Sequence, residues 1–114
     1  MTTASETPVL DTIAAMTVDS LERCGLPMDQ LLLTRIAALA ASDAPPISYL
    51  AHIGPAIKAD LPMAAVQDVL VAIAPIVGTA RVMTAAGNIA AAFGIAIAVA
   101  EEEIEAEAAA EGGI

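Results

Sequence analysis

The stretch that decides the fold of this chain is DAPPISYLAH, residues 43–52. Two adjacent prolines in it, Pro45 and Pro46, predict a turn over residues 42–46, because proline cannot continue a preceding helix. Pro46 also suits the first turn of a new helix, where its missing N–H would have no partner. The stretch therefore predicts a helix over residues 46–59, bent at Gly54–Pro55, which carries the single histidine of the chain, His52.

Before this turn, the spacing of apolar residues predicts two helices. The nearer one covers residues 28–41. The first helix opens at Pro8 or Asp11 and closes at Gly25, and residues 1–7 form a flexible N-terminus. On one face of the nearer helix lie the apolar side chains of Leu31, Leu32, Ile36 and Leu39.

After the turn, two more helices are predicted. Asp60 is expected to cap a fourth helix that begins near Pro62 and ends at Gly78. The fifth helix starts near Thr79 and runs to about Ala100. With no alternating, strand-like run, the chain is expected to be all-α, a single-domain bundle of five to six helices.

The helical domain is predicted to span residues 8–100, and an acidic tail, EEEIEAEAAAEGGI, fills residues 101–114. Three successive glutamates at a helix C-terminus oppose the helix dipole. Two interpretations stay open for this tail: the fifth helix continues through it, or it is disordered.

Composition excludes several classes of partner. Net charge is −10, and the four cationic residues are scattered: Arg23, Arg35, Lys58 and Arg81. Nucleic-acid binding needs clustered lysine or arginine, so we expect no nucleic acid as a partner and no attraction to an anionic membrane. A small acidic molecule stays possible as a ligand.

One long uncharged segment, Val82–Ala100, has about the length that crosses a bilayer. Asn88 interrupts it, alanine makes up much of it, and Glu101 follows it without a basic anchor. We therefore expect other subunits to bury this helix on several sides, in a homo-oligomer, and no membrane insertion. Lipid is the alternative.

Cys24 is the single cysteine, so neither an intrachain disulfide nor a cysteine-based metal site is expected. One histidine and separated carboxylates do not make a ligand set, and we expect no metal and no cofactor. The first residues contain no basic region of a secretory signal. These features favour a cytoplasmic protein.

Between Arg35 and Gly94, the order of elements resembles the carboxymuconolactone decarboxylase-like family, which includes the alkyl hydroperoxidase D group. The residues that carry the resemblance are TRIAALA at 34–40, His52, LPMAAVQDVL at 61–70 and APIVGTAR at 74–81. This resemblance covers roughly half of the chain. It implies a helical fold of the alkyl hydroperoxidase D type and assembly into trimers or hexamers.

The peroxidase branch of this family uses a C-x-x-C-x-x-x-H motif and a glutamate in the preceding helix. Counted back from His52, the two cysteine positions hold Pro45 and Ser48, and no glutamate lies between Arg23 and Glu101. A thiol peroxidase needs a thiolate and a resolving partner. The resemblance therefore supports the fold and argues against peroxidase activity, because His52 alone is retained.

His52 is the candidate catalytic residue, as a general acid or base assisted by Ser48 and Tyr49 on the same helix. The competing interpretation is a histidine packed at a helix or subunit interface. Arg81 is the candidate for binding a substrate carboxylate. Its competing interpretation is an ion pair with Asp68 or Asp43.

Arg35 is expected to look outward or to pair with Asp29 or Asp43. Two functions remain open on these residues. One is a homo-oligomeric interaction protein that has lost thiol chemistry, and the other is a lyase that uses His52 on a small acidic or lactone-like substrate. The enzyme gains support if Ser48, Tyr49, His52 and Arg81 line one hollow.

Overall fold

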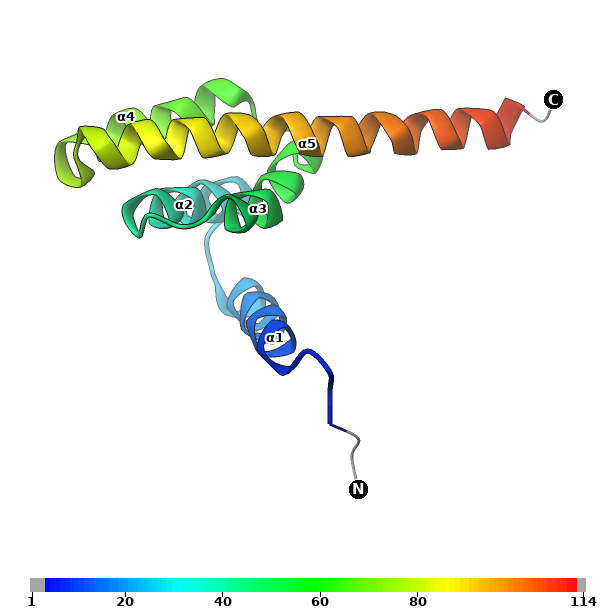
Figure 1. Cartoon of the computed structure of the whole chain (residues 1–114), viewed down its shortest axis with the longest axis horizontal. Helices are drawn as coiled ribbons and strands as arrows, with labels where there is room; N and C mark the ends of the chain where they lie inside the picture. Colours follow the sequence, from blue (N-terminus) through cyan, green and yellow to red (C-terminus); the bar gives the residue numbers. More distant parts are fainter. Residues whose placement is uncertain (1–3, 113–114) are drawn as a thin grey trace.

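Five helices and no strand make up residues 4–112, the part of the chain that the computed structural model describes (Figure 1). Beyond Gly94, side chains are described for Glu105 and Ala109. The all-α prediction is confirmed for this part of the chain. The elements are α1 (Pro8–Arg23), α2 (Met28–Ala41), α3 (Pro46–Lys58), α4 (Met63–Val77) and α5 (Thr79–Gly112).

Prolines and glycines set the helix boundaries much as the sequence predicts. Pro8 begins α1, and Pro46 begins α3 after an extended Pro45. At the end of α4, Gly78 has φ 93°, a conformation that an L-residue adopts only with strain. Pro55 lies inside α3, which continues through it to Lys58.

α5 continues past Ala100 to Gly112, which agrees with the first of the two interpretations left open for the acidic segment. Alanine and glutamate are both strong helix formers, which explains the continuation into the acidic segment. The predicted boundary between residues 100 and 101 thus falls inside one helix. The expectation that residues 82–100 are buried on several sides lies partly outside the described side chains, as does most of the acidic tail. Residues 1–3 of the predicted N-terminal segment also lie outside.

Helices α2 to α5 enclose the hydrophobic core. Tyr49 and Ile53 of α3 are buried completely, together with Ile36 of α2 and Val66 of α4. The wall from α5 consists of Ala85, Ile89, Ala92 and Phe93. A smaller cluster of Leu31, Leu32 and Ala56 joins α2 to α3, and the partly buried free thiol of Cys24 packs against it.

α1 stands apart from this core (Figure 1). None of its residues is buried. Its large apolar side chains are between 38% and 69% exposed, namely Val9, Leu10, Ile13, Met16, Val18 and Leu21. Within the described residues, α1 therefore has an apolar face that its own chain does not cover.

The turns after α2 and α3 are built alike, each around an aspartate with positive φ. Asp43 (φ 54°) follows α2 and Asp60 (φ 58°) follows α3. At the end of α3, the N–H of Leu61 donates to the Ala56 carbonyl at 3.0 Å, and the N–H of Asp60 donates to the Ile57 carbonyl at 3.0 Å. These two bonds form a Schellman motif, which ends a helix with a left-handed residue.

The predicted role of Asp60 as the cap of α4 is wrong. The N-cap of α4 is Pro62, and no side chain caps this helix. Asp60 instead closes the helix before it, where the left-handed conformation orients its backbone.

Among the helices of the described part, none is both long and apolar enough to cross a membrane.

Replacing Asp60 with glycine is predicted to stabilise the fold by about 0.5–1 kcal/mol. The left-handed conformation strains an L-residue, and a carboxylate opposes the dipole at the end of α3. Urea denaturation measures the change, with Asp60→Asn separating the charge from the strain. Asp68→Asn, an exposed site inside α4, is the control and is expected to be neutral. A destabilised Asp60→Gly variant would contradict the assignment of the turn.

Candidate functional site

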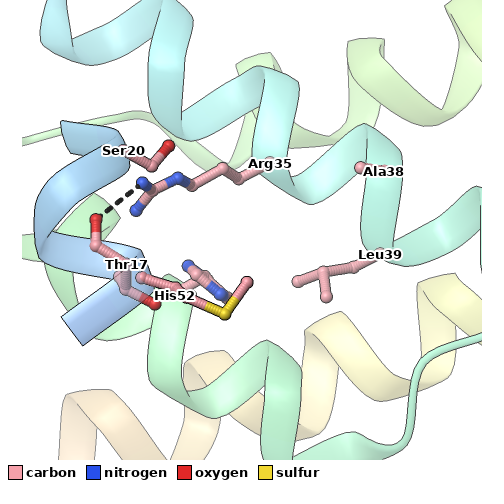
Figure 2. A pocket seen from close by; sticks show the side chains of 7 residues that line it. Thr17, Ser20, Arg35, Ala38, Leu39 and His52 are labelled. Carbon is pink, nitrogen blue, oxygen red and sulfur yellow. Dashed lines mark hydrogen bonds between the residues drawn. The ribbon is translucent and has the colours of Figure 1, made fainter. Parts of the chain in front are cut away.

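A hollow of about 280 Å³ lies where α1 meets α2 and α3. Figure 2 shows Arg35 from α2 and His52 from α3 both extending into this space, with Thr17 and Ser20 of α1 on one side. The hollow opens to solvent, and its lining is mostly apolar. The residues that line it are Met16, Thr17, Ser20, Arg35, Ala38, Leu39 and His52.

Arg35 is the cation of this hollow. Its side chain is partly buried and donates from Nη2 to the Thr17 carbonyl oxygen at 3.1 Å (Figure 2). The expected outward orientation or ion pair is therefore wrong. Asp29 and Asp43 lie six residues before and eight after Arg35, and neither spacing brings side chains together along a helix.

His52 is half-buried on the opposite wall. Burial lowers the pKa of His52 below its ordinary value, and the positive charge of Arg35 lowers it further. No acidic residue lines the hollow in the described part of the chain. The imidazole is therefore neutral at pH 7 and can act as a base or as a hydrogen-bond partner.

Three predicted site residues lie away from this hollow. Tyr49 is 1% exposed and belongs to the core, where burial and then the charge of Asp43 raise its pKa. Ser48 is partly buried and does not line the hollow. Arg81 donates from Nη1 to the Ala41 carbonyl at 2.7 Å, which is a helix C-terminus rather than one of the expected acids. Of the four predicted site residues, His52 alone lines the hollow.

Sequence reasoning missed Arg35 and the contribution of α1. One feature of the sequence could have placed Arg35 beside His52. The turn between the two helices runs from Ser42 to Pro45. Arg35 lies seven residues before Ser42, and His52 lies seven residues after Pro45. In two antiparallel helices joined by a short turn, residues at equal distances from the turn lie side by side. No comparable signal places Thr17 or Ser20, because the packing of α1 depends on tertiary structure.

Comparisons with protein families, with curated proteins and with solved structures find no match to this chain. The resemblance to the carboxymuconolactone decarboxylase-like family therefore stays a prediction. Among the described residues, no group of three or more histidine, cysteine or acidic side chains is placed to hold a metal ion.

The lowered pKa of His52 predicts a loss of stability in mild acid. The unfolded chain binds a proton on this side chain near pH 6.5, whereas the folded chain resists it to lower pH. The free energy of unfolding is therefore at its full value above about pH 7 and falls as the pH drops below 6.5.

His52→Gln removes this titration, so its stability is expected to fall less than that of the wild type between about pH 7 and 5.5. Denaturant unfolding at a series of pH values measures both slopes. Equal slopes in the two proteins would show that His52 is protonated as easily in the folded chain as in the unfolded one.

Proposed function

We propose that this chain is a carboxymuconolactone decarboxylase-like protein that lacks the peroxidase dithiol and works as a homo-oligomer in the cytoplasm. Trimers or hexamers are the assemblies that the family resemblance implies. Pro45 and Ser48 stand at the cysteine positions of the peroxidase branch, so thiol peroxidase activity is not part of the proposal. The proposed fold is of the alkyl hydroperoxidase D type.

The observation that carries the assembly is the uncovered apolar face of α1. A short helix such as α1, with 16 residues, takes most of its stability from packing of its apolar face. In α1 no side chain is buried, and Val9 and Ile13 are 69% and 53% exposed. A second copy of the chain supplies apolar surface for this face, since Val71 and Ile76 of α4 are also exposed.

Light scattering is expected to give the mass of a trimer or larger at micromolar protein concentration. Ile13→Asp is predicted to lower this mass, because it places a charge on the apolar face of α1. Ala15→Asp is the matched control, since Ala15 is exposed on the same helix about 200° away. A wild-type monomer, or equal loss of mass in both variants, would contradict the proposal.

A second candidate function is a His52-dependent lyase acting on a small acidic or lactone-like substrate. What favours it is the placement of a neutral imidazole beside a guanidinium in one solvent-open hollow. The imidazole would accept a proton from the substrate, and the cation would balance negative charge. Because Ser48, Tyr49 and Arg81 do not line this hollow, His52 alone would carry out the proton transfer.

His52→Gln is predicted to lower the rate of any such reaction by roughly 10²–10⁴-fold, the usual range for general acid–base catalysis. Glutamine keeps much of the size and hydrogen bonding while it removes the titration. The measurement is turnover of small carboxylic acids and lactones, with light scattering of the variant as a check. Activity that survives would place the chemistry elsewhere, and a dissociated variant would make His52 a residue of assembly.

A further inference from the structure

The charge of the hollow is unusual for this chain. Fourteen acidic and four cationic residues give the protein a net charge of −10, yet none of the residues that line the hollow is acidic. Arg35 is the one formal charge there at neutral pH, because His52 is neutral. The hollow is therefore a local positive site in a negative protein, and it favours an anion over a cation.

Arg35 keeps the capacity to bind such an anion. A guanidinium has five N–H donors, and the bond to the Thr17 carbonyl uses one of them. That bond also fixes the side chain in the hollow, so less entropy is lost when a ligand binds. Arginine matches the two oxygens of a carboxylate in a planar, bidentate arrangement.

The other residues that line the hollow determine which kind of group the bound anion can carry. Met16, Ala38 and Leu39 offer apolar contact, and Thr17 and Ser20 stand on the α1 side. At about 280 Å³, the hollow lies near the lower limit of pockets for drug-sized ligands, which run from ~300 to 1,000 Å³. A ligand of modest size with a short hydrocarbon part fits this space.

We infer that the hollow between α1, α2 and α3 binds a small amphiphilic monocarboxylate, with its carboxylate on Arg35 and its hydrocarbon part against Met16, Ala38 and Leu39. His52 donates a hydrogen bond from its N–H to the carboxylate. A dicarboxylate fits less well, because its second charge would lie against apolar walls without a partner. This inference rests on the lyase proposed above and names its substrate class.

The single histidine gives a direct experiment on the full-length protein. The imidazole signals of His52 are followed by NMR while hexanoate is added. Hexanoate is expected to shift them saturably and to raise the pKa of His52 towards its ordinary value, because the carboxylate offsets the charge of Arg35. Hexanol, hexylamine and succinate, at equal concentrations, are expected to give shifts at least ten-fold weaker.

Arg35→Gln is expected to weaken the response to hexanoate at least ten-fold, and Lys58→Gln, the matched loss of an exposed cation on another helix, is expected to leave it unchanged. Ala38→Glu tests the site without touching Arg35. Ala38 is exposed and lines the hollow, so the new carboxylate competes with the ligand while the fold is kept. Ala38→Gln has the same size without the charge and is expected to bind more tightly than Ala38→Glu.

Three results would overturn the inference: no saturable shift with hexanoate, an unchanged response in Arg35→Gln, or equal responses to hexanoate and to hexanol or succinate. Failure of the lyase looks different. Binding that depends on Arg35 without turnover of any acid would reject the lyase and keep the site. Turnover that survives Arg35→Gln would reject the site and keep the lyase.

Discussion

The turn between α2 and α3 is the constraint on which the rest of the bundle depends. Asp43 in its left-handed conformation lets the N–H of Ala44 reach the Leu39 carbonyl at 3.0 Å, which closes α2. At the same helix end, Arg81 donates to the Ala41 carbonyl at 2.7 Å. This turn thus reverses the chain, and the helix end beside it binds the start of α5 through Arg81. A cation beside the last carbonyls of α2 complements the dipole of that helix and offsets the nearby aspartate.

The parts of the fold that the sequence predicts are those decided by one residue's backbone chemistry. Pro8, Pro46 and Gly78 mark helix boundaries because ring closure or a missing Cβ acts locally, whatever surrounds it. Asp60 shows the limit of such reasoning. Aspartate serves both as a helix N-cap and as a residue tolerated in the left-handed region, and the hydrogen bonds of the turn decide between them.

The candidate site shows the same difference between what local chemistry decides and what tertiary packing decides. His52 is found from the sequence because it is the one side chain whose unperturbed pKa lies near neutrality. Tyr49 has suitable chemistry but lies on the face of α3 that points into the core, three residues from His52. The sequence predicts that Arg35 looks outward or pairs with an acid, yet its contact is a backbone carbonyl of α1. Such partners depend on how whole helices pack together, and residue spacing along one helix does not reveal that packing.

α1 links the two proposals physically. It forms one wall of the hollow through Thr17 and Ser20, and it has no buried side chain of its own. A wall made by a marginal helix persists only while that helix is held in place. In the proposed oligomer, a neighbouring copy that covers the apolar face holds α1 against Arg35. A ligand bound in the hollow contacts the same helix through Met16, which is also one of the exposed apolar side chains of α1. By linkage, whatever factor the proposed assembly changes ligand affinity in the hollow by, an occupied hollow changes assembly by the same factor.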